Sequence, residues 1–570
     1  MRKRFDLFGC ILLLSVFLFS VPASAKKDVK GGKSEYVVLV SKAVQDDAAW
    51  NKVVEALQTL HDALVIPFDK LPGEVLEPLK KAHPRYVAVV EKPENITPEY
   101  IRKMHRVSRE AGSGIFEAFL WGMITGYDAE SALRVVEDAR TPMVIRTALS
   151  TAQEMEYTSC FDKCGVISQD VQRDMFKGIR EAFKNADPVL VEQLKQLNEV
   201  IKEKSETNQP VSDSLTNLVK EINAKIQANS AKTKIKTMTA WEEKTREQDT
   251  LTRHEIEVDS ILFKFLDLYK QLDPEFLLTS SYGVDYTTLH RGVDEVVRAK
   301  EGKLFLDFKQ GPEYFPRGEN RRVYLATGYY GGATFGKADN QVTAWMKDGN
   351  VSALAGYCKR QWHEQAGWGT WKLWIFNPGR YTFAEAVFMN MQFILSRLND
   401  WNPKFQDVDY PETDDVNRDW ESNVAEVTKA IGADMVTLDQ MGYLYDRDAF
   451  VYYGDPKWDA RLQASPEDLH YKVTTERKGN KYVLTIQTDS RFDRRQMSGN
   501  YYKEKTTMFN STTLGRLPFS YFFPERLNNP KLAKKLAFEG GVEVNENFIF
   551  IHDCFFEPNQ TYEVVLSVKK

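Results

Sequence analysis

The sequence predicts an α/β fold in which a parallel sheet is flanked by helices. Short apolar runs rich in β-branched residues alternate with helical segments over residues 36–150, and the alternation returns from residue 276. The last hundred or so residues carry strand patterns only. Strands that are apolar on both faces and separated by helices are typical of a parallel sheet covered on both sides. A mature chain of about 545 residues is too long for one core, so several domains are expected.

The first α/β region contains four candidate strands, at residues 36–40, 63–67, 86–90 and 143–147, with helices near 47–60, 73–81 and 98–110. In the second region, strands are predicted at 276–280, 304–308, 323–327 and 351–355, and a helix follows Thr382. Because the carboxyl ends of parallel strands meet at one edge of a sheet, chemistry is expected there.

A helical hairpin is predicted between the two α/β regions. Apolar residues recur at helical spacing in two groups, separated by a turn at Gln209–Pro210. The groups are Leu190, Leu194, Leu197 and Ile201, and then Leu215, Leu218, Ile222 and Ile226. We expect an insertion that packs on the sheet and carries no chemistry of its own.

The C-terminal segment predicts a small antiparallel β-sandwich. A hairpin runs over residues 471–487 around the turn Gly479–Asn480, and further strands begin at Phe548 and Tyr562. The expected domains are a signal peptide at 1–25, an N-terminal α/β subdomain at 26–170, a helical insertion at 171–270, a second α/β subdomain at 271–460 and the sandwich at 461–570.

The N-terminus has the three parts of a cleavable signal peptide. Arg2, Lys3 and Arg4 precede an apolar run, Pro22 ends it, and Ala23-Ser24-Ala25 offers small residues for a signal peptidase. The alternative is a retained anchor, but the apolar stretch is shorter than the roughly 20 residues that a spanning helix needs. No later stretch is long and apolar enough to span a membrane. We therefore expect a secreted or periplasmic protein.

Composition excludes some partners and cofactors. The formal charge of −5 argues against nucleic acid as the main partner. Gly331–Lys337 matches the spacing of a phosphate loop, but Ala338 stands where a Ser or Thr would hold magnesium. Glu412, Asp414 and Asp415 offer oxygen ligands for calcium without a defined ligand spacing. No cofactor and no metal are expected.

Four cysteines remain after removal of Cys10: Cys160, Cys164, Cys358 and Cys554. Four in so long a chain do not form a disulfide scaffold, and no further ligands near Cys160 and Cys164 complete a zinc site. A local disulfide between these two and a pair of thiols both stay open, as does the pairing of all four.

Several short motifs carry a resemblance to the gingipain-type cysteine peptidases. They are His83-Pro-Arg-Tyr-Val-Ala, Trp121-Gly-Met-Ile-Thr-Gly-Tyr, Tyr324-Leu-Ala-Thr-Gly, Ala355-Gly-Tyr, Gly367-Trp-Gly, Pro378-Gly-Arg-Tyr-Thr and Tyr453-Gly-Asp-Pro456. The resemblance covers about two thirds of the mature chain and is sharpest over 276–460. It implies a caspase-like fold followed by an Ig-like sandwich.

The resemblance also implies a His-Cys dyad, and this chain departs from it at both positions. The histidine position falls on Tyr282 and the cysteine position on Tyr330, and no cysteine lies between residues 165 and 357. A phenol with an ordinary pKa near 10 is protonated at neutral pH and is a poor acyl-transfer nucleophile. The resemblance therefore implies a catalytically impaired relative that keeps a cleft for polypeptide binding or scaffolding.

The alternative is an active cysteine endopeptidase that uses Cys358. This cysteine ends a predicted strand, His363 lies five residues on, and Lys359 and Arg360 would lower the pKa of the thiol. The opposing interpretation is a buried structural cysteine. Trp362, Trp368, Trp371 and Trp374 are either core residues or the wall of a peptide groove. The partner is expected to be a polypeptide, and the oligomeric state stays open.

Sequencing the N-terminus of the exported protein tests the signal peptide. The mature chain should begin at Lys26, because the Ala23-Ser24-Ala25 signal directly precedes it. A mature protein that keeps Met1 would contradict export by this route.

Overall fold

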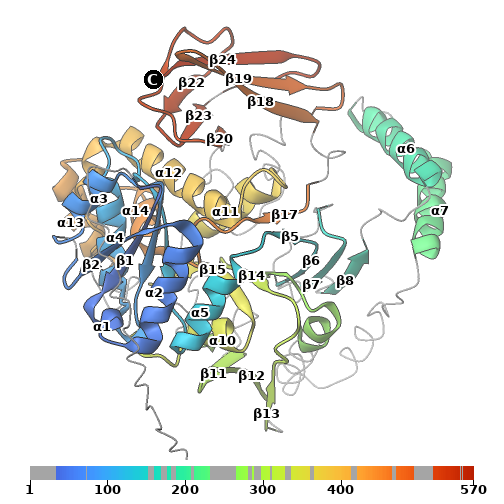
Figure 1. Ribbon diagram of the computed structural model, residues 1–570. Helices are drawn as coiled ribbons and strands as arrows, with labels where there is room; N and C mark the ends of the chain where they lie inside the picture. Colours follow the sequence, from blue (N-terminus) through green and yellow to red (C-terminus); the bar gives the residue numbers. More distant parts are fainter. Residues whose placement is uncertain are drawn as a thin grey trace, which may run out of the picture.

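The chain folds into a mixed α/β body with antiparallel sheets at its C-terminus (Figure 1). The computed structural model describes residues 34–71, 73–151, 160–167, 176–181, 188–206, 211–230, 265–279, 286–287, 297–308, 311–327, 336–359, 365–411, 420–464, 470–492, 518–552, 554 and 556–569. Its central sheet has eleven strands in the order β2-β1-β3-β4-β16-β15-β14-β9-β6-β7-β8. The predicted class, a mostly parallel sheet flanked by helices, is confirmed.

Four parallel strands form the N-terminal half-sheet: β1 (Tyr36–Ser41), β2 (Leu64–Phe68), β3 (Tyr86–Val90) and β4 (Leu120–Ile124). The helices of this half are α1 (Lys42–Gln45), α2 (Ala48–His61), α3 (Leu76–Ala82), α4 (Pro98–Glu110) and α5 (Ala129–Asp138). Every residue of β1, β3 and β4 is buried, which explains why their sequences are apolar on both faces. Pro67 lies on β2, the edge strand of the sheet, which is where proline is tolerated in a strand.

The second half-sheet contains β6 (Thr147–Ser150), β7 (Lys163–Ile167), β8 (Phe176–Glu181), β9 (Phe276–Thr279), β14 (Arg322–Ala326), β15 (Val351–Tyr357) and β16 (Phe450–Tyr453). Its helices are α10 (Gln341–Lys347), α11 (Gln365–Ile375), α12 (Phe383–Trp401), α13 (Trp420–Ile431) and α14 (Leu438–Ala449). Strands β6, β9, β14 and β15 run parallel, whereas β8 and β16 are antiparallel to their neighbours β7 and β15. Strand β8 falls within the stretch assigned above to the helical insertion.

Two strand assignments from the sequence need correction. Residues 304–308 form part of β12 (Lys303–Phe308), which belongs to a separate antiparallel sheet with β10 (Tyr286–Thr287), β11 (Val297–Lys300) and β13 (Gly311–Tyr314). Residues 143–147 divide between β6 and β5 (Met143–Ile145), and β5 pairs only with β17 (Ala460–Leu462). A short apolar run shows that a strand is half-buried or buried, but it does not identify the strand's partners.

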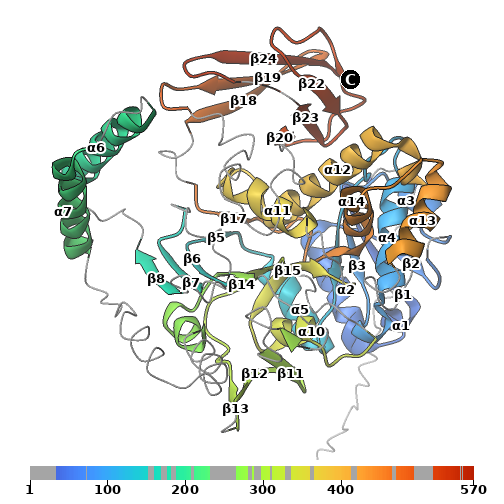
Figure 2. The same ribbon diagram turned by 180° about the vertical axis from the view of Figure 1, so that it is seen from behind.

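The predicted helical hairpin is present as α6 (Pro188–Glu206) and α7 (Asp213–Ser230). Its turn, Gln209–Pro210, lies outside the described residues. Figures 1 and 2 show the hairpin at the side of the molecule, beyond β8, rather than packed over a face of the central sheet.

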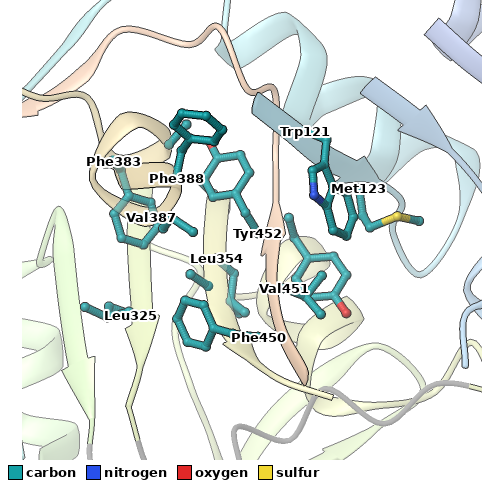
Figure 3. Close-up of a cluster of buried hydrophobic side chains, with 14 of the residues drawn as sticks. Trp121, Met123, Leu325, Leu354, Phe383, Val387, Phe388, Phe450, Val451 and Tyr452 are labelled. Atoms are coloured by element: carbon teal, nitrogen blue, oxygen red, sulfur yellow. The ribbon is translucent and has the colours of Figure 1, made fainter. Parts of the chain in front are cut away.

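The two half-sheets meet between β4 and β16, and we call this junction the seam. Strand β16 pairs with β15 over four residues but with β4 only through Tyr453 and Met123, supported by a hydrogen bond of 2.9 Å from the Gly454 N–H to the Met123 carbonyl. A Cβ atom at Gly122 would lie 2.3 Å from the Gly454 carbonyl oxygen, so only glycine permits this approach. Figure 3 shows apolar side chains of β4, β16 and α12 gathered around the seam.

The segment Gly454-Asp455-Pro456 fastens one side of the seam. The Asp455 carboxylate is fully buried, accepts a hydrogen bond of 2.9 Å from the Tyr36 hydroxyl and lies 2.6 Å from Nε2 of His61. The rings of Tyr36 and His61 stack with centroids 4.1 Å apart. This motif, one of those that carry the family resemblance, therefore makes a tertiary contact to β1 and α2.

The C-terminal segment forms two antiparallel sheets that share a hydrophobic core. One contains β18 (Tyr471–Lys478), β19 (Lys481–Thr488), β21 (Lys531–Leu532) and β24 (Thr561–Ser567), and the other β20 (Phe519–Phe522), β22 (Gly541–Val544) and β23 (Phe548–His552). Figure 1 shows these sheets above α11 and α12.

The three-stranded sheet also belongs to the core of the α/β body. Phe522, Phe548 and Phe550 are buried in that core, and Phe388 of α12 packs against the first two with ring centroids about 6 Å apart. The guanidinium of Arg85 lies over the Phe522 ring at 4.4 Å and donates to the carbonyl oxygens of residues 523 and 524. The two units are thus joined by buried contacts.

An isolated fragment of residues 461–570 should expose Phe522, Phe548 and Phe550 to water and self-associate. Burying each such ring is worth on the order of 2–3 kcal/mol, so their exposure is a strong drive for association. Size-exclusion chromatography and binding of a hydrophobic dye measure this, with the full chain as control. Changing the three phenylalanines to serine should return the fragment to a monomer. A monomeric fragment with its native sequence and no dye binding would contradict the shared core.

Candidate functional site

The carboxyl ends of three parallel strands lie side by side in the second half-sheet. Ala326 of β14 pairs with Thr279 of β9, and Leu325 pairs with Ala355 of β15. Beyond the last ladder pair, the backbone N–H and the hydroxyl of Thr327 both donate to the Thr279 carbonyl, at 2.8 and 3.0 Å. The Thr279 hydroxyl lies 2.8 Å from the Tyr324 hydroxyl. We call the ends of these strands the strand-end edge.

The dyad positions follow two strands of this edge in the sequence. Tyr282 comes three residues after Thr279, the last residue of β9, and Tyr330 comes three residues after Thr327, which follows β14; both tyrosines are outside the described residues. The same holds for His363 and for the acidic loop of Glu412, Asp414 and Asp415. In the described part, Thr279 ends β9 and Thr327 follows β14, and these two strands are neighbours in the sheet. The segments that contain Tyr282 and Tyr330 therefore follow adjacent strands in the chain.

Cys358, the alternative nucleophile considered from the sequence, follows directly after β15 and lies within the described residues. Its backbone N–H donates to the Ala449 carbonyl at 2.8 Å, and the residue is only 1% exposed. Burial raises the pKa of the Cys358 thiol to about 12; the charge of Lys359 acts in the opposite direction but is outweighed. Lys359 does lower the pKa of the thiol, as the sequence suggests, but burial raises it by more, so the pKa of Cys358 lies above its ordinary value. At pH 7 roughly one molecule in 100,000 would carry the thiolate.

The tryptophans of the following helix form core and not groove. Trp371 and Trp374 are fully buried, and their rings lie 5.6 and 5.3 Å from the Phe276 ring of β9. The indole N–H of Trp374 donates to the Tyr381 carbonyl at 3.0 Å. Trp368 is buried as well, whereas Trp362 lies outside the described residues. Of the two interpretations left open by the sequence, the described tryptophans support the core.

The start of α11 is fixed tightly against the strand-end edge. The Gly367 N–H donates to the Tyr357 hydroxyl at 2.9 Å, and the Ala366 N–H donates to the Asp446 carboxylate at 2.8 Å. A Cβ atom on Gly367 would lie 3.0 Å from Cα of Thr327, so the helix approaches β14 as closely as a glycine allows. The carboxylate satisfies a terminal amide of the helix and suits its positive end.

A second polar cluster lies at the seam and was missed by the sequence analysis. The Nδ1 atom of His105 lies 3.0 Å from the Glu117 carboxylate, and its Nε2 atom lies 2.9 Å from the Phe450 carbonyl oxygen. His105 and Glu117 are each 3% exposed. Ser108 donates to Glu117 at 2.7 Å and not to the imidazole. Ser108, His105 and Glu117 therefore lack the hydrogen bond from serine to histidine that activates a serine nucleophile. The cluster is not a hydrolytic triad.

A cavity of about 20 Å³ adjoins this cluster, lined by side chains of α4, β4, α12 and β16. It has room for about one water molecule and not for a substrate. Among the described residues, no three His, Cys, Asp or Glu side chains come together in a way that could hold a metal ion.

Comparisons with known proteins give one structural likeness. No protein-family model matches the chain, and no curated protein sequence matches it. Among solved structures, the Arg-specific cysteine proteinase gingipain R (RGPB) aligns with 10% identical residues over 82% of this chain and 87% of that chain, at a TM-score of 0.34. The chemistry of the site is accordingly derived from the side chains of this chain.

Labelling with a small maleimide tests the state of Cys358. We expect no labelling of Cys358 in the native protein at pH 8 over hours, because the thiol is buried and protonated. Cys554, which is partly exposed, should react at least tenfold faster. Mass spectrometry of peptides from native and urea-unfolded samples gives both rates in one experiment. Rapid native labelling at Cys358 would show that the sulfur reaches solvent and is open to catalysis.

Proposed function

We propose that this chain is an exported protein with a cysteine-peptidase type of fold that binds a polypeptide and does not cleave it with a thiol. The observation that carries the proposal is Cys358. It is the described cysteine that follows a strand of the strand-end edge, yet its sulfur is buried and the pKa of its thiol is raised to about 12. A nucleophile needs the opposite environment, partly exposed and with a lowered pKa.

The sequence supplies the second support. The resemblance to gingipain-type peptidases places Tyr282 and Tyr330 at the dyad positions, and no cysteine lies between residues 165 and 357. The motifs that carry this resemblance occupy structural positions. Arg85 docks the C-terminal sheets, Gly367 lets α11 approach β14, and Asp455 fastens the seam. A chain that keeps these scaffold residues without a dyad fits a binding or scaffolding protein.

Binding is proposed at the strand-end edge, where ligands of open α/β sheets gather. Two described lysines border the segments that leave strands of this edge: the exposed Lys337 stands in the connection from β14 to α10, and Lys359 follows β15. Export rests on the N-terminal signal pattern. In the described part of the chain, no helix is long and apolar enough to cross a membrane.

Two assays on the mature protein test the proposal. In the first, a panel of peptides with basic and neutral residues at the cleaved position should not be hydrolysed, and Cys358→Ala should behave like the native protein. Turnover that disappears in Cys358→Ala would establish an active cysteine endopeptidase. Turnover that survives in Cys358→Ala would exclude that alternative and also contradict a non-catalytic role.

The second assay measures binding of fluorescein-labelled, reduced and carboxymethylated α-lactalbumin, an acidic unfolded polypeptide, by anisotropy. Lys337→Glu with Lys359→Glu should weaken binding about fivefold or more, because like charges are then placed against the ligand. Lys531→Glu with Lys534→Glu, two exposed lysines at and just after β21, changes the net charge by the same amount and is the matched control, which should bind as the native protein does. Absence of binding by the native protein, or equal loss in the control, would contradict the proposed surface.

A further inference from the structure

The small antiparallel sheet of β10, β11, β12 and β13 has one buried side. Val297, Leu304 and Leu306 are at most 1% exposed and belong to the hydrophobic core. Helix α10 packs on this side, and the Gln341 side chain donates to the Val297 carbonyl at 2.9 Å. Because side chains alternate along a strand, the residues between these point to the opposite side of the sheet. Figures 1 and 2 show β11, β12 and β13 at the end of the molecule opposite the C-terminal sheets.

The opposite side carries an aligned pair of aromatic rings. Phe305 of β12 lies directly across from Tyr314 of β13 on one flank and from Arg298 of β11 on the other. The ring centroids of Phe305 and Tyr314 are 5.6 Å apart. Phe305 is half-buried, whereas Tyr314 is 52% exposed. Two such rings on a flat sheet offer a stacking surface to a ligand.

Cations border the ring pair. Lys300 and Lys303 face each other across β11 and β12, and both are exposed. Each lies two positions along its strand from the Arg298–Phe305 pair, so all four residues share one side of the sheet. Nζ of Lys303 lies 5.9 Å from the centroid of the Tyr314 ring, within the range of cation–π attraction. We call the side of the sheet that carries these five residues the open face.

The charge of the open face is positive. Glu313 lies across from Leu306 on the buried side and pairs with Lys270 at 2.6 Å. Glu301 belongs to the turn between β11 and β12, and Asp307 falls on the open face by its position in β12. Among the described strand positions of the open face, three cations thus stand against one acid, although the whole chain has a charge of −5. Such a surface is complementary to an anionic ligand.

We propose that the open face binds an acidic polysaccharide, with its sugar rings stacked on the two aromatic rings and its carboxylates paired with the three cations. The flat C–H face of a pyranose packs on an aromatic ring without needing a pocket, which suits a sheet surface. A polymer of uronic acids carries a carboxylate on every sugar, so stacking and ion pairing occur along the same chain. The open face lies in the connection from β9 to β14 and shares no residue with the strand-end edge, so its ligand is independent of the polypeptide proposed above.

Other anionic polymers fit this surface less well. A polypeptide strand would have to add to the free edge of β13, but β13 is only four residues long and contains Pro312, which has no N–H to donate. Nucleic acid is opposed by the overall negative charge of the chain. A polysaccharide that stacks on the face needs neither a free strand edge nor a basic protein.

Fluorescence anisotropy of fluorescein-labelled oligogalacturonate, titrated with the mature protein at low salt, tests this site. We expect saturable binding that unlabelled polygalacturonate displaces and neutral dextran does not. Tyr314→Ser should weaken binding about tenfold, because the exposed stacking ring is lost. Lys300→Glu with Lys303→Glu should weaken it about tenfold or more, because like charges then face the carboxylates. All three side chains are exposed, so the variants should keep the native fold.

Lys478→Glu with Lys481→Glu is the matched control. These lysines also face each other across a two-residue turn and are exposed, but the next pair on their side is Glu476 with Val483, without an aromatic ring. This variant should bind oligogalacturonate as the native protein does.

Four outcomes would overturn the site. They are no binding by the native protein, native affinity in Tyr314→Ser, equal loss in the two lysine pairs, and stronger competition by polyglutamate, single-stranded DNA or anionic vesicles than by polygalacturonate. The Tyr314→Ser variant should bind labelled α-lactalbumin as the native protein does, so that failure at the open face and failure at the strand-end edge are told apart.

Discussion

The architecture depends on how two half-sheets are joined where the backbone provides almost no ladder. Between β4 and β16 a single residue pair, Tyr453 with Met123, continues the sheet. Side-chain contacts therefore hold the two half-sheets together. Asp455 gathers the hydroxyl of Tyr36 and the imidazole of His61 on one side, and His105 bridges α4 to β16 on the other. Without these contacts the seam would consist of apolar packing around one backbone bridge, and that packing is interrupted by a small cavity.

Buried cations are accommodated in a consistent way throughout the molecule. Arg447 donates to the carbonyls of residues 405 and 408 as well as to Asp448, and Arg85 donates to carbonyls of the C-terminal sheets. Arg380 donates to the Ser520 carbonyl and the Tyr471 hydroxyl at 2.9 Å each and lies among aromatic rings. A planar guanidinium with several donors can satisfy carbonyls on two elements at once. These arginines connect separate units of the fold, and two of them, Arg85 and Arg380, lie in short motifs that carry the resemblance to gingipain-type peptidases.

Much of the fold could be predicted from the sequence because burial on both faces leaves a visible pattern. Strands β1, β3, β9, β14 and β15 are continuous apolar runs, and each was located within a residue or two. Strand β4 was missed because Gly122 interrupts its apolar run, although that glycine is what admits the close approach of β16. Pairing partners were not predictable from periodicity, which explains the misplacement of residues 304–308. The cluster around His105 had no signal at all, since its partners lie 12 and 345 residues away. The candidate site was predictable only as a place, the strand-end edge.

The sequence separation across the seam has a consequence for how the chain reaches this structure. His105 must wait for Phe450, 345 residues later, and Tyr36 must wait for Asp455, 419 residues later. Forming a contact between residues so far apart in the chain requires a large loss of conformational entropy before the contact stabilises the fold. Chains dominated by such contacts fold slowly. The N-terminal half-sheet therefore has an open edge at β4 for most of the time during which the chain is made. A truncation before residue 450 would lack β16 and would leave the edge of β4 unpaired, which favours association with other chains.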